Sequence, residues 1–240
     1  MNLKRPKMIL FDYGQTLISE TTPYDLERGF RAMLQCARAN PERITAGQLV
    51  AEFKALHKRI WEKNHSNVEP CLRYLFRYLF ELYGLSFDQD WIGLEQVFWD
   101  ASVRFAKTDG LEALLAYLSS NGIRSGVISN IDYAEETLSR VIYRELPDAP
   151  FEFIIATSEY LFRKPDAEIF KLALKKAGLP AEDVWYCGND SLCDVAGPAK
   201  LGITPVWYQG SPFFKDQDEP GCEHLKIQHW NELYQILKKL

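Results

Sequence analysis

The sequence has few cysteines and no long apolar run. Its 240 residues include five cysteines, and no two of them form a Cys-x-x-Cys pair, so neither a disulfide framework nor a zinc site is indicated. No apolar run approaches the roughly 20 residues of a membrane-spanning helix, and the run near the N-terminus is too short for a signal sequence. We therefore expect a cytoplasmic protein that is neither secreted nor inserted in a membrane.

An excess of positive charge is also absent. The chain has 28 Lys and Arg against 33 Asp and Glu, a formal net charge of -5. This balance provides no general attraction for nucleic acid or for anionic membranes. A content of 47% hydrophobic and 25% charged residues is ordinary for a folded protein. We expect a small-molecule substrate as partner, with no nucleic acid and no membrane, and a monomer or homodimer.

Two kinds of pattern divide the chain. Residues 7–11 form a short apolar run that is typical of a buried strand, and from about residue 108 onward apolar strands alternate with amphipathic helices. Such alternation predicts a parallel sheet with helices on both faces. Between these parts, apolar residues recur at helical spacing. We predict an α/β protein with a Rossmann-like core, residues 1–18 and 107–240, interrupted by an all-helical domain, residues 19–106.

Polar residues follow four of the predicted strands, at the edge where open parallel sheets bind ligands. A carboxylate there can attack phosphorus or carbon, and carboxylates in a turn suit a hard cation such as Mg²⁺. A hydroxyl or an amide can bind phosphoryl oxygens, and a lysine can neutralise an anionic group. Each residue alone is as well explained by helix capping, a turn or solvent exposure, and Pro165 is expected in the first turn of a helix. The residues are Asp12, Ser129, Asn130, Lys164, Asn189, Asp190 and Asp194.

The order and spacing of these segments resemble the haloacid dehalogenase-like hydrolase superfamily. FDYGQTL resembles its first motif, VISN its second, RKPDAEIF its third and GNDSLCDVAG its fourth, so the resemblance covers essentially the whole core. The helical insertion is similar to the cap domain that closes over the site in this family. The resemblance implies a Mg²⁺-dependent phosphatase that acts on a small phosphorylated metabolite through an aspartyl-phosphate intermediate.

The resemblance also implies catalytic roles. Asp12 would be the nucleophile, and Lys164 would balance the charge around it. Ser129 and Asn130 would bind the phosphoryl group. Thr16, which we place with them in the phosphate-binding set, would help to order the turn of the first motif.

A metal site follows from the same resemblance. Mg²⁺ would be held by Asp12, the backbone carbonyl of Gly14 and acids of the fourth motif. Asp190 is the first choice among these, and Asn189 is a neighbour or an indirect ligand. Asp194 is expected to orient other groups or to bridge through water.

The sequence departs from the family at Gly14. Phosphatases of this family usually carry a second Asp two residues after the nucleophile, which protonates the leaving group and then activates water. General acid–base catalysis typically contributes roughly 100- to 10,000-fold. The glycine therefore puts efficient hydrolysis of ordinary alkyl phosphates in doubt.

Three alternatives follow from this departure. A halide leaving group needs no protonation, so a dehalogenase or another carbon-centred hydrolase is the first, although Asp190 favours a metal that those relatives do not use. Phosphonate-cleaving relatives also tolerate a small residue at this position, but they need a cap lysine, for which Lys54, Lys58 and Lys63 are the candidates. The third is a catalytically impaired protein that binds phosphate or a partner.

Overall fold

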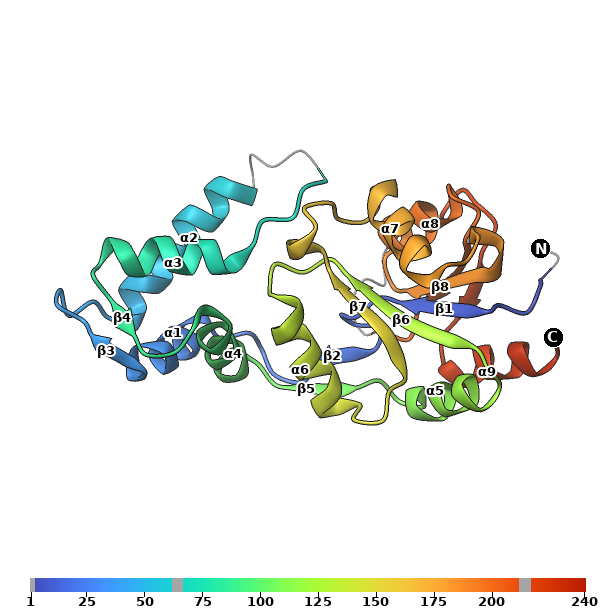
Figure 1. Ribbon diagram of the computed structural model, residues 1–240, viewed down its shortest axis with the longest axis horizontal. Coiled ribbons are helices and arrows are strands. Elements are labelled where there is room, and N and C mark those ends of the chain that lie inside the picture. Colours follow the sequence, from blue (N-terminus) through green and yellow to red (C-terminus); the bar gives the residue numbers. More distant parts are fainter. Residues whose placement is uncertain (1–2, 62–66, 212–216) are drawn as a thin grey trace.

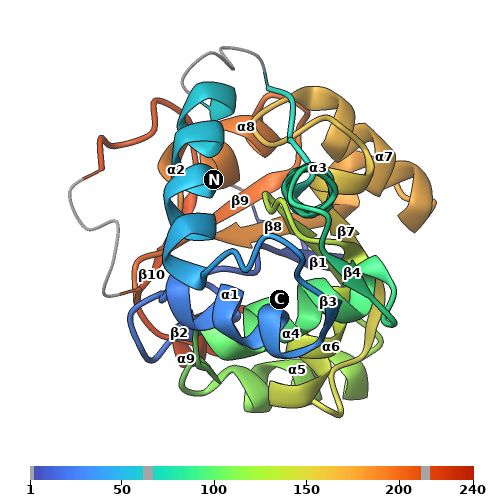
Figure 2. The same cartoon turned by 90° about the vertical axis from the view of Figure 1, so that its left-hand side faces the viewer.

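The computed structural model describes residues 3–61, 67–211 and 217–240. It has two lobes, one built on a large sheet and the other on helices inserted after the first strand (Figure 1). The first strand runs toward the inserted lobe, which therefore lies beyond the carboxyl end of that strand. Figure 2 views the molecule from the side of the inserted lobe.

The larger lobe contains a sheet of six parallel strands. They are β1 (Met8–Phe11), β6 (Arg124–Ser129), β7 (Phe151–Ala156), β8 (Val184–Gly188), β9 (Thr204–Tyr208) and β10 (Leu225–Ile227), in the order β10-β9-β8-β1-β6-β7. The side chains of β1 alternate between the faces: Ile9 and Phe11 join one hydrophobic cluster, and Met8 and Leu10 join the other. A continuously apolar strand suits a sheet that is covered on both faces. The predicted α/β class and parallel sheet are confirmed.

Helices cover both faces of this sheet. On one face, Leu114, Leu138 and Leu233 come from three different helices and join the same cluster, whereas Phe170 packs on the other face. No helix among the described residues is long and apolar enough to cross a membrane. The helices are α5 (Leu111–Ser120), α6 (Glu135–Glu145) and α9 (Trp230–Lys238) on the first face, and α7 (Ala167–Ala177) with the short α8 (Gly197–Ala199) on the second.

The inserted lobe packs its helices around aromatic side chains. The ring centroids of Phe30 and Phe98 lie 5.0 Å apart, and those of Phe76 and Phe98 lie 4.8 Å apart. Aromatic pairs at this separation add to the stability that comes from their burial. The helices are α1 (Leu26–Gln35), α2 (Ala46–Trp61), α3 (Leu72–Leu82) and α4 (Trp91–Ser102).

Short strands occur where the sequence predicted only helices. β3 (Ala37–Ala39) pairs with β4 (Ser86–Phe87), so the insertion is not all-helical. The backbone N–H and C=O groups of these two segments, which lie between helices, need hydrogen-bond partners and find them in each other. β2 (Ile18–Glu20) pairs antiparallel with β5 (Phe105–Lys107), and the predicted domain boundaries fall within this pair. The two segments that connect the lobes therefore run side by side.

A buried carboxylate also connects the lobes. Glu95 of α4 is fully buried, and its Oε2 accepts hydrogen bonds from the backbone N–H of Ala134 at 2.9 Å and the hydroxyl of Thr137 at 2.7 Å. These groups form the first turn of α6, whose N-cap residue, Ala134, supplies no capping side chain. The alternative that Ser129 and Asn130 cap this helix is excluded, because Glu95 accepts the hydrogen bonds there.

We predict that Glu95 makes stability depend on pH. Burial raises the pKa of its carboxyl from 4.5 to about 7, and the bonds from Thr137 and Ala134 only partly oppose this. The folded state then binds the proton more tightly than the unfolded state, so stability is lost as the pH rises from about 4.5 through about 7. Relative to Glu95→Gln, the wild-type free energy of unfolding should fall by up to about 3 kcal/mol over this range in urea denaturation. The exposed-site variant Glu112→Gln should follow the wild type, and parallel curves for wild type and Glu95→Gln would contradict the prediction.

Candidate active site

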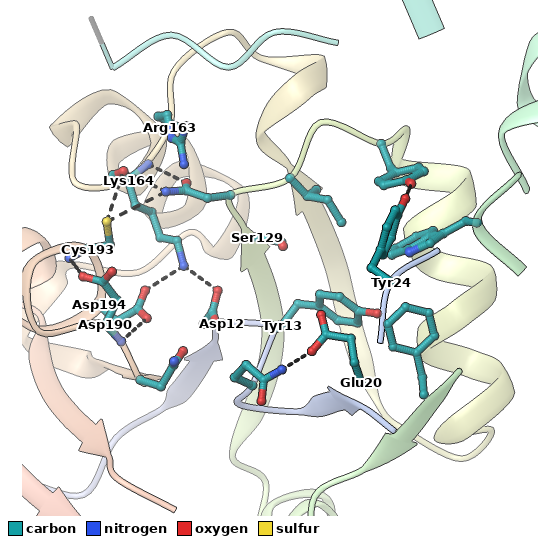
Figure 3. Close-up of a pocket in the computed structure, with 18 residues that line it drawn as sticks. Asp12, Tyr13, Glu20, Tyr24, Ser129, Arg163, Lys164, Asp190, Cys193 and Asp194 are labelled. Atoms are coloured by element: carbon teal, nitrogen blue, oxygen red, sulfur yellow. Dashed lines mark hydrogen bonds and ion pairs between the residues drawn. The ribbon is translucent and has the colours of Figure 1, made fainter. Parts of the chain in front are cut away.

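One pocket brings the four sequence motifs together. It lies beyond the carboxyl ends of β1, β6 and β8, and its volume of about 390 Å³ suits a small metabolite. Figure 3 shows Asp12, Lys164 and Asp194 pointing toward one another at its polar end. Thr16 does not line this pocket. The residues singled out from the sequence that do line it are Asp12, Gly14, Ser129, Asn130, Lys164, Asn189, Asp190 and Asp194.

Lys164 lies at the centre of the polar end. Its side chain is 2% exposed, and its ammonium group donates hydrogen bonds to Oδ1 of Asp12 and to Oδ1 of Asp194, each at 2.7 Å. A third bond, at 2.8 Å, goes to the hydroxyl of Tyr186, so all three N–H donors are satisfied. Burial alone would lower the pKa of Lys164, but the two carboxylates raise it well above its usual range. The side chain is therefore a buried cation.

Asp12 is held through both of its carboxylate oxygens. Oδ1 accepts the bond from Lys164, and Oδ2 accepts a bond from the hydroxyl of Thr16 at 3.1 Å. Its backbone N–H donates to the carbonyl of Cys187 on the neighbouring strand at 2.8 Å. Each carboxylate oxygen has more than one acceptor position, so Asp12 can still meet a ligand. The carboxylate is oriented at the wall of the pocket, as a nucleophile requires.

Thr16 lies behind Asp12. It is fully buried, and its hydroxyl is also 3.2 Å from Oδ1 of Asn189. The residue thus connects the first and fourth motifs. The sequence placed Thr16 in the phosphate-binding set, but the geometry favours only its ordering role, since it contributes no surface to the pocket.

The second and third motifs meet through Asn130. Its amide oxygen accepts a bond from the backbone N–H of Lys164 at 2.7 Å, and its amide nitrogen donates to the Lys164 carbonyl at 2.8 Å and contacts Sγ of Cys193 at 3.9 Å. The Asn130 side chain therefore positions Lys164 more than it faces a ligand. By contrast, the hydroxyl of Ser129 lines the pocket and has no hydrogen-bond partner among the described residues.

The helix after Lys164 does not begin at Pro165, as the sequence predicted, but at Ala167. Asp166 is the N-cap of α7, and its carboxylate accepts a bond from the backbone N–H of Glu168 at 2.9 Å. Pro165 therefore precedes the cap and is not in the first turn. The expectation for this proline was wrong, because the aspartate that follows it takes the capping position.

The fourth motif combines capping with free oxygen atoms. Oδ1 of Asp190 accepts backbone N–H bonds from Leu192 at 2.9 Å and Cys193 at 2.7 Å, where a π-helical turn (Ser191–Ala196) begins. Its other oxygen accepts no backbone bond from the part of the chain that the structure describes. Asp194 is tied to Lys164 through Oδ1 and to the Asp190 N–H through Oδ2 at 3.0 Å, so its geometry suits orientation of other groups.

The donors at this end of the pocket are oxygen atoms. No group of three or more His, Cys, Asp or Glu side chains within the described ranges is arranged to hold a metal. A cation would instead depend on the carboxylates of Asp12 and Asp190 together with the Asn189 amide and the Gly14 carbonyl. Hard oxygen donors of this kind are what Mg²⁺ prefers, so the residues present fit it by their chemistry.

Two other kinds of candidate nucleophile are disfavoured. Cys193 lines the pocket, but burial raises the pKa of its thiol to about 12, which keeps it protonated and weakly nucleophilic. Lys54 and Lys58 are exposed on α2 and do not line the pocket. Lys63 lies outside the described residues. Asp12 is therefore the best-placed nucleophile.

Sequence reasoning missed the other end of the pocket. Trp99 stacks on Tyr133 with ring centroids 4.2 Å apart and meets Tyr13 edge-on at 6.2 Å. Glu20 lies beside Tyr13, on the side of Asp12 away from Lys164 (Figure 3). No single stretch of sequence contains these residues together, so no local signal reveals the set. This second end is lined by Tyr13, Glu20, Tyr24, Trp99, Phe105 and Tyr133, with Arg163 also in the pocket.

Known proteins resemble this chain in sequence and fold. A family model described as haloacid dehalogenase-like hydrolase matches residues 87–208. A glyceraldehyde 3-phosphate phosphatase of Pyrococcus abyssi is 24% identical over 85% of this chain and 81% of its own, and an (S)-2-haloacid dehalogenase of Pseudomonas fluorescens is 24% identical over 58% and 57%. The crystal structure of a HAD phosphatase from Thermococcus onnurineus covers 96% of this chain and 97% of its own, with a TM-score of 0.61 and 16% identity. That structure shares the fold.

We predict that Gly188 is required for the position of Asp194. A Cβ atom at residue 188 would overlap with Cβ, Cγ and Oδ2 of Asp194. Gly188→Ala should therefore displace a partner of Lys164, lowering the free energy of unfolding by about 1–3 kcal/mol and the hydrolysis of p-nitrophenyl phosphate by about a hundredfold. The matched control is Gly47→Ala in α2, where an added Cβ meets nothing within 4 Å. If both variants behave like the wild type, the site does not need this close approach.

Proposed function

Because the chain belongs to the haloacid dehalogenase-like hydrolase family, we propose that it is a Mg²⁺-dependent phosphatase that releases phosphate from a small phosphorylated metabolite. The observation that carries the proposal is the carboxylate of Asp12, held by Lys164 and Thr16 at the wall of a pocket of metabolite size. The name of the Pyrococcus abyssi relative, a phosphatase of a three-carbon phosphate, supports the same class of substrate.

The proposed reaction has two steps. A carboxylate oxygen of Asp12 attacks phosphorus and the bond to the leaving oxygen breaks, which gives an aspartyl phosphate; water then attacks phosphorus and releases phosphate and Asp12. Lys164 keeps a positive charge next to Asp12 and, through its bond to Oδ1, holds the orientation of the Asp12 carboxylate. Ser129, whose hydroxyl lines the pocket, is free to donate a hydrogen bond to a phosphoryl oxygen.

The proposed metal site uses the oxygen donors next to Asp12. Asp12, the Gly14 carbonyl and Asp190 would hold Mg²⁺, with Asn189 as a neighbour or indirect ligand. When bound, the cation would screen the repulsion between the carboxylate nucleophile and an anionic phosphate. Asp194 keeps Lys164 and the backbone of Asp190 in position and is not itself needed as a ligand.

Hydrolysis at carbon is the second candidate function. Gly14 supplies no carboxyl group, and a halide leaves without protonation. The haloacid dehalogenase of Pseudomonas fluorescens is also a relative of the chain, over a shorter span. The pair of Asp12 and Asp190 in one pocket favours the phosphatase, because a second carboxylate beside the nucleophile suits a cation.

We predict that Asp12→Asn abolishes phosphate release. The amide is a poor nucleophile, so the rate with p-nitrophenyl phosphate and a panel of phosphorylated metabolites in Mg²⁺ should fall by about a thousandfold or more, with the circular dichroism spectrum unchanged. Asp90→Asn, an exposed helix cap in the inserted lobe, should keep wild-type activity. Activity that survives in Asp12→Asn would remove Asp12 as nucleophile. A wild type that releases no phosphate from any compound of the panel but hydrolyses 2-haloacids would favour hydrolysis at carbon.

We predict that Asp190 sets the affinity for Mg²⁺. Asp190→Asn keeps an oxygen that can cap the π-helical turn but removes the charge. The Mg²⁺ concentration for half-maximal activity should therefore rise on the order of tenfold or more, and EDTA should abolish wild-type activity. Asp90→Asn, which changes a cap outside the pocket, is again the control. An unchanged Mg²⁺ titration would place the cation elsewhere.

A further inference from the structure

Position 14 leaves an unfilled place in the pocket. Gly14 lines it, and a Cβ added there would meet no heavy atom within 4 Å among the described residues other than its two chain neighbours. Gly14 itself supplies no side chain that could act as a proton donor. An alkoxide leaving group nevertheless needs a proton, and general acid catalysis is worth roughly 100- to 10,000-fold.

Glu20 reaches the same pocket from the connector between the lobes. It ends β2, pairs with Phe105 of β5 and lines the pocket with Asp12 and Gly14. Figure 3 shows its carboxylate across from the cluster of Lys164, Asp190 and Asp194. In an in-line displacement the leaving oxygen departs on the side of phosphorus opposite the nucleophile. A proton donor must therefore reach the pocket from outside the cluster that holds Asp12 in place, and Glu20 lines the pocket outside that cluster.

Gln15 holds this carboxylate in place. Its side-chain amide donates to Oε2 of Glu20, and its own amide oxygen accepts a bond from the Ser211 hydroxyl at 3.4 Å. Gln15 has a φ of 61°, in the left-handed region that non-glycine residues seldom adopt. Strain of this kind persists where the surroundings enforce it, often at functional sites. Oε1 of Glu20 has no hydrogen-bond partner in the described ranges and is left for a ligand.

The other titratable groups of the pocket are worse proton donors. Asp190 and Asp194 lie on the Lys164 side, and the pKa of the Cys193 thiol is raised to about 12 by burial. Burial also raises the pKa of the Tyr13 phenol well above its usual range. Among the described residues that line the pocket, Glu20 is the one carboxyl group that is neither Asp12 nor part of the fourth motif.

We infer that Glu20 supplies the acid–base group that position 14 lacks, an inference that rests on the proposed phosphatase function. As the bond from Asp12 to phosphorus forms and the bond to the leaving oxygen breaks, the Glu20 carboxyl gives its proton to that oxygen and an alcohol departs. Water then attacks the aspartyl phosphate, and Glu20 takes its proton as the bond to Asp12 breaks. Phosphate leaves, and Glu20 is again protonated for the next turnover.

The test is a series of leaving groups. We expect Glu20→Gln to lower kcat/KM for glycerol phosphate about a hundredfold or more, for phenyl phosphate less, and for p-nitrophenyl phosphate by under about tenfold, because a good leaving group needs little protonation. Glu27→Gln, an exposed glutamate of the inserted lobe, should change none of these values.

A second variant separates chemistry from structure. Gly14→Asp should restore glycerol phosphate hydrolysis in the Glu20→Gln background and raise it less in the wild type, since the two carboxyls would do the same work. An equal loss on all three substrates, or no rescue, would overturn the role of Glu20 while the Asp12-dependent phosphatase stands. A wild type that releases phosphate from none of them would overturn the proposed function and this inference with it.

Discussion

The rest of the site depends on the hydrogen bonds and ion pairs of one buried group, the ammonium of Lys164. Removing such a charge from water costs several kcal/mol unless it is paired and all its donors are bonded. Its acceptors come from three places: Asp12 after β1, Tyr186 within β8, and Asp194 in the turn after β8. The lysine can be buried only when these elements are in register. In return, it lets two carboxylates lie close together that would otherwise repel each other.

The parallel sheet turns sequence-distant motifs into neighbours. β1 lies between β8 and β6, so the residues that follow these strands emerge at one edge. The hydrogen bond from Lys164 to Asp12 spans 152 residues, and that from Thr16 to Asn189 spans 173. Both close at the same edge because the strands are parallel and in register. The fold thus sets the position of the Asp12 carboxylate, while its hydrogen bonds set its orientation.

The sequence predicts the core fold and the polar end of the pocket, but little of the opposite end. Asp12 and Ser129 could be found because the pattern that predicts each strand also predicts where it ends, and Lys164 because it comes shortly before a predicted helix. Tyr186 could not be found this way: within an apolar strand a tyrosine looks like core, and its hydroxyl matters only because a lysine from another element reaches it. Glu20 carries no local signal either, since its place depends on the pairing of β2 with β5 across the whole insertion.

The position of Glu20 on the connector gives the inserted lobe a part in the chemistry. An acid two residues after the nucleophile would share its turn and keep a fixed distance from it, whatever the inserted lobe does. Glu20 instead belongs to the β2–β5 pair through which the chain enters and leaves that lobe, and Trp99 and Tyr133, from the two lobes, meet in the same pocket. The Gln15 amide that holds the Glu20 carboxylate lies in the turn that follows Asp12, so this hydrogen bond ties the connector to the segment that carries Asp12. A substrate bound between Asp12 and Trp99 would therefore contact both lobes, with the proposed acid on the segment that joins them.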